Sequence, residues 1–588
     1  MRRARALATA LTLVVGLLGL AACGGLPSES DVQPGLALGP APGEAFHIAY
    51  DGPTKGATQD EIVRGFLRAG AGFDDDHQVA RQFLTPKLAD DWEPETHVLV
   101  HAGETSFRVR DDLPDKVTVD AKAVATVDEK GYYTDLSARA RWSATFTLQK
   151  IGGQWRISKL PREFGLWLSA LDFERLYESF GINYVDSGSH AMVPDVRWFP
   201  TGPGLATSLA RAQLQPVPDY LRGAVQTGAP SGTQMNVDAV AVENGLATVD
   251  LTVRVRDADV AHRKMLWAQF LTTLDQSPSV RAVSMKVDGS PLEVPGVPAA
   301  PTDPSQVGYS LVTGGGEPAM LREGTELTRV DATQTTLPKV YPSPSTPLPQ
   351  VPIGWISLAA SPDGRQLAAI GGDHKDLGRW KGSTFHLLPR FSSWLTEPSF
   401  GSRHDLWVAG LSGGRSRLWY LDTREPLTAA APHRVRVPWL GKRQIVDFRM
   451  SRTDQRAVIV TQDPRTGNDQ VAVTAVRRDR RGQPTRLTSP KRIGSTLMSV
   501  TDIVWISDRS VAVLGRTSVK ERIRPFVIDI GGQLTPLNPV VGARSITATG
   551  EGGDQGILIV TDRDKVVTRA GASWPEYGTG TDVVVPGS

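Results

Sequence analysis

Hydrophobic and polar positions change their period several times along this chain of 588 residues. A capping-box pattern at residues 58–61 precedes apolar side chains at helical spacing over residues 62–67, and a second amphipathic segment follows up to residue 88. Between residues 98 and 157 the period changes to two, which predicts several antiparallel strands. Helices followed by strands indicate an α+β domain, which we place at residues 46–170.

The next stretch, residues 184–294, mixes helical and strand patterns within one compact unit. We expect a helix over residues 205–214 and a second, brief helix over residues 220–223. Asn244-Gly245 lies between two alternating segments, and Asn-Gly accepts the positive φ angles of a type I′ hairpin turn. A longer amphipathic helix is ended by Pro278, and another alternating strand completes the unit. This order predicts an α/β domain.

The last stretch, residues 305–588, repeats one pattern after a proline-rich linker. Each unit shows an apolar strand, a tight turn, a second apolar strand, and a third strand after a loop. The clearest turn is Pro362-Asp363-Gly364, which fits a type I turn with its glycine in the left-handed conformation. Repeats of about 40–55 residues with three or four strands are typical of propeller blades. We therefore predict a multidomain, β-rich protein with a C-terminal β-propeller of about six blades.

The N-terminus carries a targeting pattern. Three arginines precede an apolar run over residues 6–20, and the run ends at Leu20-Ala21-Ala22-Cys23. A charged start, an apolar run and small residues before a cut site are the features of a secretory signal peptide, here residues 1–22. The last four residues have the form of a bacterial lipobox, so we predict that Cys23 carries lipid such as palmitate and anchors the chain to the cell membrane. The alternative is an ordinary signal peptide with an incidental cysteine.

Residues 23–45 are rich in Gly, Pro and Ser, and we expect them to form a flexible tether between the lipid and the first domain. The domains after the tether would then work on the extracytoplasmic face of the membrane.

Charge and cysteine content exclude several classes of function. The chain has 65 Lys and Arg against 63 Asp and Glu, and removal of residues 1–22 takes away three arginines and leaves a net charge of −1. This balance gives no general attraction for nucleic acid, and the expected location outside the cytoplasm excludes nucleic acid as a partner. Cys23 is the only cysteine, so the mature protein can form neither a disulfide nor a thiolate metal site.

The sequence assembles no catalytic, cofactor-binding or metal site that we can identify. Residues 74–77, Asp-Asp-Asp-His, indicate a solvated turn, because three successive carboxylates cannot all face one point. His97 and His101 share a strand face but lie about 13 Å apart, too far for one metal ion. Asp250 and Asp288 lie at strand ends, where acidic turn residues are common. We therefore expect a protein that is not an enzyme and needs no cofactor.

The strongest charge cluster is Arg477-Arg478-Asp479-Arg480-Arg481, with Arg486, Lys491 and Arg492 shortly after it. Such a cluster could contact anionic lipid headgroups, wall polymers or an acidic protein surface. The alternative is a solvated loop of a propeller blade.

Several motifs of the middle domain resemble the GerMN domain of sporulation and germination proteins. They are Leu221-x-Gly223, Pro230-Ser-Gly-Thr233, Asn244-Gly-x-Ala-Thr-Val-Asp250 and Val280-x-x-Val283-x-Met-x-Val287-Asp-Gly289. The phrase Gly153-Gln-Trp155-Arg-Ile157 resembles the last strand of the NTF2/cystatin-like fold. GerMN domains are generally regarded as binding or assembly modules, and the resemblance implies that role here.

Lipobox, NTF2-like region, GerMN domain and propeller occur in the order of the actinobacterial LpqB lipoprotein family, which the chain resembles over essentially its mature length. The resemblance implies that the protein binds the ectodomain of a sensor histidine kinase, MtrB, and modulates the MtrA–MtrB two-component system, with effects on growth and division. A second hypothesis is a surface propeller that binds wall polymer or acts on carbohydrate. A glycosidase would need two carboxylates about 5–10 Å apart in a cleft.

Overall fold

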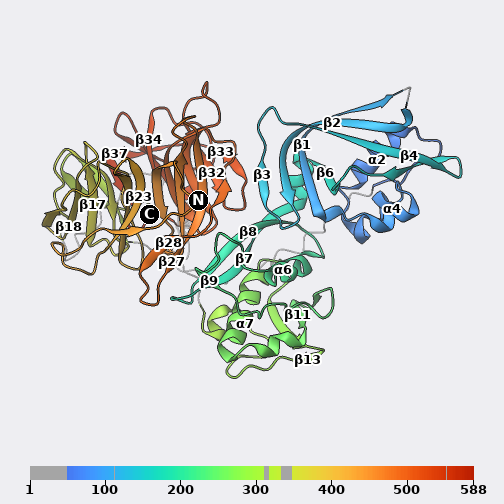
Figure 1. Ribbon diagram of the computed structural model, residues 1–588, viewed down its shortest axis with the longest axis horizontal. Helices are drawn as coiled ribbons and strands as arrows, with labels where there is room; N and C mark the ends of the chain where they lie inside the picture. Colours follow the sequence, from blue (N-terminus) through green and yellow to red (C-terminus); the bar gives the residue numbers. More distant parts are fainter. Residues whose placement is uncertain (1–49, 111–112, 310–316, 333–346, 551) are drawn as a thin grey trace, which may run out of the picture. The chain divides into compact units, whose positions relative to one another are not determined.

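The computed structural model describes residues 50–110, 113–309, 317–332, 347–550 and 552–588, and Figure 1 shows their helices and strands. The predicted signal peptide, Cys23 and the tether over residues 23–45 lie outside the described residues. No helix in the described ranges is long and apolar enough to cross a membrane.

The first domain combines short helices with a six-stranded sheet. The sheet order is β5-β4-β2-β1-β6, with β3 beside β2, and the pair β1–β6 is parallel. Helix α2 packs across β1, β2, β5 and β6. In chain order the elements are α2 (Gln59–Ala69), η1 (Asp74–His77), α3 (Gln78–Arg81), α4 (Pro86–Asp91), η2 (Pro94–Thr96), β1 (His97–Arg110), β2 (Leu113–Asp128), β3 (Tyr133–Asp135), β4 (Arg141–Ile151), β5 (Gln154–Lys159), β6 (Leu166–Ser169) and α5 (Ala170–Leu176).

Local sequence explains these elements. The Thr58 backbone N–H donates to the Glu61 carboxylate at 2.8 Å, so the predicted capping box starts α2. Along β2 every second side chain from Val117 to Val127 is buried, which is the expected result of a period of two. The predicted α+β character is therefore confirmed. The second amphipathic segment is divided into η1, α3 and α4, because His77 has a φ of 57° and Pro86 begins a new helix.

The second domain pairs two small sheets with two helices. One sheet has the order β8-β7-β9, and the other has the order β10-β11-β12-β13, with β11 and β12 parallel. The elements are β7 (Tyr177–Asp186), β8 (Met192–Pro200), α6 (Leu205–Gln213), β9 (Val225–Gln226), β10 (Ala241–Glu243), β11 (Leu246–Leu251), η3 (Val253–Asp257), α7 (Val260–Leu274), β12 (Ala282–Val287), β13 (Ser290–Pro291) and η4 (Pro304–Val307).

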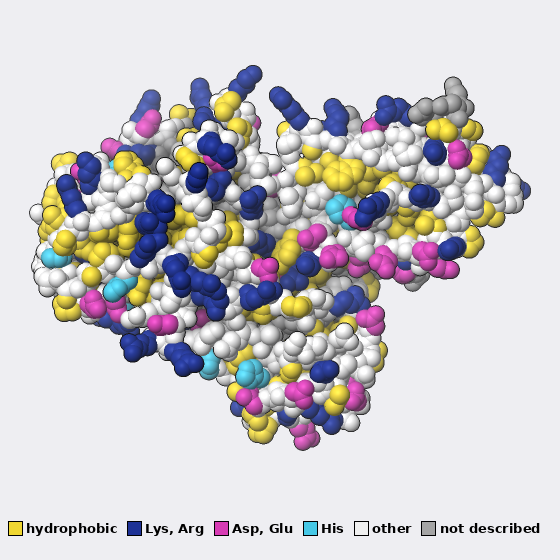
Figure 2. All heavy atoms as spheres, viewed as in Figure 1, with side chains coloured by type: hydrophobic (Ala, Val, Ile, Leu, Met, Phe, Trp, Pro, Cys, Tyr) yellow, Lys and Arg dark blue, Asp and Glu magenta, His cyan; other side chains and the backbone are white. Residues whose placement is uncertain are grey.

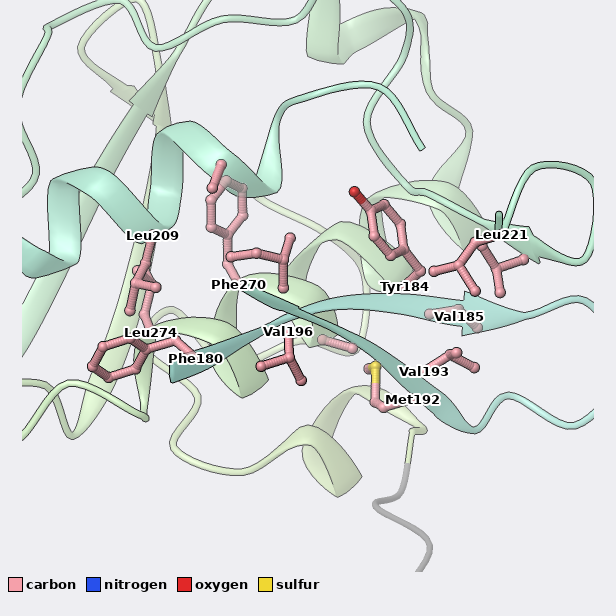
Figure 3. Packing of buried hydrophobic residues seen from close by; sticks show 14 of the residues in the cluster. Phe180, Tyr184, Val185, Met192, Val193, Val196, Leu209, Leu221, Phe270 and Leu274 are labelled. Carbon is pink, nitrogen blue, oxygen red and sulfur yellow. The ribbon is translucent and has the colours of Figure 1, made fainter. Parts of the chain in front are cut away.

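Apolar side chains from both helices and from the β7–β8 hairpin form the core of this domain. Figure 3 shows Leu209 of α6 and Phe270 of α7 above the hairpin that carries Phe180 and Val196. Gln269, which is fully buried on α7, donates to the Asn183 carbonyl at 2.8 Å and accepts from the Gly228 backbone N–H at 2.7 Å. The buried polar groups of Gln269 and Asn183 are thus hydrogen-bonded inside this core.

The prediction of a brief helix over residues 220–223 is wrong, because these residues form turns and, at Arg222, an isolated bridge to Val225. Gly223 has a φ of 80°, which ends a helix. A Cβ at Gly223 would lie 2.8 Å from the guanidinium carbon of Arg477, so this glycine also allows the Arg477 side chain to approach.

The C-terminal domain is a β-propeller whose described residues form six antiparallel blades, in agreement with the prediction. Gly364 has a φ of 63°, as its predicted turn requires. Blade 1 contains β14 (Ala319–Glu323), β15 (Glu326–Val330) and β38 (Asp582–Val584). Blade 2 contains β16 (Trp355–Ala360), β17 (Gln366–Gly371), β18 (Leu377–Lys381) and β19 (Thr384–Leu387). Blade 3 contains β20 (Trp394–Leu395), β21 (Ser399–Phe400), β22 (Asp405–Ser412), β23 (Arg415–Asp422) and β24 (His433–Val435).

Blade 4 contains β25 (Gln444–Met450), β26 (Arg456–Gln462), β27 (Asp469–Arg478), β28 (Pro484–Leu487) and β29 (Lys491–Ile493). Blade 5 contains β30 (Ser499–Ser507), β31 (Ser510–Arg516), β32 (Arg524–Asp529) and β33 (Leu534–Pro536). Blade 6 contains β34 (Ala543–Ala548), β35 (Ile557–Thr561), β36 (Lys565–Thr568) and β37 (Glu576–Thr579), with η5 (Gly553–Gly556) between its first two strands.

The propeller closes on itself through its last strand. β38 pairs with β14, so both ends of the domain contribute to blade 1. The strands β38, β16, β21, β25, β30 and β34 contact one another in this order around the axis. A closed ring of this kind leaves the blades without an open sheet edge at the point of closure.

Candidate functional site

The structure shows no metal-binding arrangement for the histidines and acids considered above. Residues Asp74–His77 form η1, and burial lowers the pKa of His77 to about 4. His97 and His101 both lie on β1, where burial lowers the pKa of each. Among the described residues, no group of three His, Cys, Asp or Glu side chains could hold a metal ion.

Asp250 and Asp288 lie at one turn of the second domain. Asp250 accepts hydrogen bonds from the Gly289 backbone N–H at 3.1 Å and from the Asn236 side-chain amide at 3.1 Å. Asp288 has a φ of 48° in the same turn. These contacts hold the turn between β12 and β13 against β11, which gives Asp250 a structural role.

The basic side chains of the cluster over residues 477–492 do not all point to the same side of the blade. Arg477 and Arg478 are neighbours on β27, so their side chains point to opposite sides. The Arg478 side chain is 10% exposed, with one nitrogen 2.7 Å from Asp405 and another 2.9 Å from Asp454. The Lys491 side chain is 13% exposed and lies next to Asp195. Within the described ranges no ion pair is formed by the remaining arginines, Arg477, Arg480, Arg481, Arg486 and Arg492.

Side chains from all three domains meet at one carboxylate, that of Asp195 on β8, which is 0% exposed. Tyr132 of the first domain donates to it at 2.8 Å, and Tyr220 of the second domain donates at 2.9 Å. Arg197, also on β8, lies 2.7 Å away, and the Lys491 ammonium of the propeller lies 3.4 Å away. We call these five residues the central junction.

The central junction places one carboxylate between two cations, with little access to solvent. Burial alone would raise the pKa of Asp195, but Lys491 and Arg197 hold it below its ordinary value. Burial lowers the pKa of Lys491, and the charge of Asp195 opposes this effect. The Lys491 nitrogen also lies 3.9 Å from the centre of the Tyr132 ring, a favourable cation–π distance. Removal of Asp195 would leave both Arg197 and Lys491 without their counter-charge.

Backbone groups also join the first domain to the propeller. The Tyr133 N–H donates to the Gly531 carbonyl at 3.1 Å, and the Asp135 carboxylate accepts from the Leu534 N–H at 3.1 Å. Gly532 has a φ of 121°, and a Cβ there would lie 1.9 Å from the Tyr133 carbonyl oxygen. This close approach requires glycine.

The second domain and the propeller share an apolar core as well as polar contacts. One hydrophobic cluster extends from Val196 on β8 to Val473 and Ile528 in blades 4 and 5. Arg456 of β26 is fully buried and donates to the Pro194 carbonyl at 2.7 Å. Residues Ala49–Ser588 consequently form one compact unit.

The inner strands of the propeller enclose a polar cavity of about 410 Å³. Arg449 of β25 is 5% exposed there, and one of its nitrogens lies 2.9 Å from Glu397 and 3.0 Å from Asp502. Because both carboxylates contact the same nitrogen, these two oxygens lie within about 6 Å of each other. The hypothesis of a carbohydrate-acting propeller requires two carboxylates at about this separation. Here the Arg449 side chain lies between the two carboxylates. That hypothesis stays a prediction.

These carboxyl groups give the stability of the propeller a pH dependence. Burial raises the pKa of Glu397 to about 7, and burial together with the charge of Glu397 raises the pKa of Asp502 to about 7. In the unfolded chain both titrate near about 4. The folded state therefore binds more protons between these values, and its extra stability is lost as the pH rises through about 7.

We accordingly expect the melting temperature to fall by several degrees between about pH 5 and about pH 8, and Glu397→Gln to reduce this slope. Glu326→Gln, which changes an exposed carboxylate of blade 1, is the matched control and should leave the slope unchanged. Thermal melts at fixed ionic strength measure the slope. Equal slopes in the wild-type protein and Glu397→Gln would contradict the prediction.

The central junction is not predicted from the sequence. Asp195 and Arg197 are two residues apart in an otherwise apolar strand, and this spacing places both charges on one face. That pattern signals a buried ion pair, because isolated charges are rarely placed in apolar strands. Nothing in the sequence indicates the other partners, which lie 25 to 296 residues away.

Comparison with known proteins relates the three domains to known families. Residues 52–174 match the family described as Lipoprotein LpqB, N-terminal domain, and residues 345–586 match Lipoprotein LpqB beta-propeller domain. Residues 182–293 match the family described as Sporulation and spore germination.

Two relatives match the chain from end to end. The chain is 26% identical to Lipoprotein LpqB of Thermobifida fusca (strain YX), over 100% of this chain and 99% of that protein. It is also 26% identical to Lipoprotein LpqB of Streptomyces coelicolor, over 98% of this chain and 97% of that protein. Among solved structures, the first GerMN domain of the sporulation protein GerM from Bacillus subtilis matches at 20% identity and a TM-score of 0.18, over 21% of this chain and 95% of that chain.

Proposed function

Because this chain belongs to the LpqB lipoprotein family, we propose that it is a lipid-anchored, extracytoplasmic accessory protein that binds and modulates a sensor histidine kinase. The kinase would belong to a two-component system of the MtrA–MtrB type, and modulation of this system would affect growth and division. The observation that carries this proposal is the end-to-end match to named lipoproteins, since it covers the predicted lipidation site as well as all three domains.

The arrangement of the domains supports a binding role. The central junction and the shared apolar core hold residues 49–588 as one unit, so surfaces of all three domains can act together on one partner. If residues 23–45 form the predicted flexible tether, they would span roughly 25 Å, and anchoring in one membrane would raise the effective concentration of the two proteins. Modulation further requires that the protein bind two kinase states with different affinities.

Photocrosslinking in intact cells tests the contact. Large apolar side chains that are strongly exposed are suitable positions for the crosslinking residue: Leu171 on the first domain is 79% exposed, and Ile353 and Val541 on the propeller are each 83% exposed. We expect the kinase to be captured from at least one position. The same positions in a Cys23→Ala chain are the control and should capture much less kinase. Absence of the kinase at all three positions would count against the proposal.

A further inference from the structure

Three arginines lie side by side on neighbouring strands of the propeller. Arg477 on β27 is directly opposite Arg486 on β28, and Arg436, which follows β24, is bridged to Arg486 from the other side. In the described ranges none of the three forms an ion pair with an acid. Figure 2 shows Lys and Arg side chains gathered over this part of blade 4. Like charges directly opposite one another destabilise a sheet, so this arrangement needs an explanation.

A cavity of about 440 Å³ lies beside these arginines, at the contact with the second domain. Arg477 and Arg486 line it from the propeller, and Arg222 lines it from the second domain. The one acid in the lining, Asp219, is 2.6 Å from Arg222, so the net charge of the lining is +2. Gly223 permits the Arg477 guanidinium to lie close to the second domain. We call this cavity the arginine pocket.

We propose that the arginine pocket binds a phosphate group of a polyanionic chain. Guanidinium groups carry N–H donors in a planar fork that matches the oxygens of phosphate, and such charge-assisted hydrogen bonds are the strong ones. A bound phosphate would also offset the repulsion between Arg477 and Arg486. The pocket is concave and also lined by Trp439 and Ser489, which suits a single anionic group with the unit attached to it better than a flat membrane surface.

Phosphate binding in the arginine pocket does not depend on the proposed binding of a kinase. A direct binding measurement tests it. The probe is a fluorescent glycerol phosphate oligomer, added to the full chain purified in detergent at about 0.15 M salt. We expect Arg486→Gln to weaken binding about tenfold, because one charge-assisted contact is lost. Arg486→Lys keeps the positive charge but lacks the forked guanidinium group, so its affinity for the oligomer should lie between those of the wild-type protein and Arg486→Gln. Arg480→Gln removes an exposed arginine of the same hairpin that does not line the pocket, and it should change the affinity less than about twofold.

Inorganic phosphate should displace the oligomer from the wild-type protein, whereas an uncharged glycerol oligomer should not. Equal weakening by Arg486→Gln and Arg480→Gln would show general charge attraction and overturn the proposal. Binding to vesicles of anionic lipid without binding to the oligomer would also overturn it, in favour of a membrane contact.

A stability measurement separates loss of binding from loss of the fold. Because Arg486→Gln removes the like charge opposite Arg477, the melting temperature without phosphate should stay the same or rise. A clearly lower melting temperature would mean that Arg486 stabilises the fold, and it would contradict the proposal.

Discussion

Replacing Asp195 by alanine is expected to lower the free energy of unfolding of the protein by about 3–5 kcal/mol. The substitution removes the counter-charge of Arg197, which is buried, and of Lys491, whose side chain is only 13% exposed. It also takes the acceptor from the hydroxyl groups of Tyr132 and Tyr220. Because these partners come from three domains, the loss should affect the whole folded unit rather than one domain.

Chemical denaturation monitored by tryptophan fluorescence measures this loss. Asp238→Ala is the matched control, because Asp238 is paired with Arg211 but its side chain is 88% exposed. An exposed pair contributes less than about 1 kcal/mol, so the control should unfold almost like the wild-type protein. A loss below about 1 kcal/mol for Asp195→Ala would contradict the role we assign to the central junction.

Replacing Cys23 by alanine is expected to release the protein from the membrane or to leave it unprocessed. Stable anchoring by lipid requires acyl chains whose buried CH₂ groups contribute about 0.8 kcal/mol each, and without the thiol no such chain can be attached. Membrane fractionation and the mass of the mature protein provide the measurement. Ser28→Ala in the predicted tether is the control and should remain in the membrane fraction. Tight retention of a cleaved Cys23→Ala protein would refute the anchor.

The features that the sequence predicted correctly depend on neighbouring residues. Asn244 and Gly245 have φ angles of 52° and 84°, as the predicted type I′ turn requires. The capping box at the start of α2 involves residues only three positions apart. The repeating strand pattern predicted the propeller because each blade is built mainly from consecutive strands. Short-range patterns of this kind can be recognised without knowing the tertiary structure.

The features that could not be predicted from the sequence depend on contacts between residues that are far apart in the chain. Asp195 and Lys491 are 296 positions apart, and no local pattern relates them. In the arginine cluster, Arg478 forms ion pairs with Asp405 and Asp454, while its neighbour Arg477 faces the arginine pocket. Alternation along a strand predicts that the two side chains point to opposite sides of the sheet, but only the tertiary structure shows which residues each of them contacts.

Reconstitution of the kinase with the lipidated protein in liposomes tests the central claim most directly. The measured quantity is phosphotransfer by the full-length kinase as the ratio of the protein to the kinase is increased. A protein that acts by binding has an effect that follows the fraction of kinase bound to it. The account therefore predicts that the phosphotransfer rate changes with this ratio and reaches a plateau. An unchanged rate at every ratio, with the protein shown to be in the same liposomes, would contradict the account.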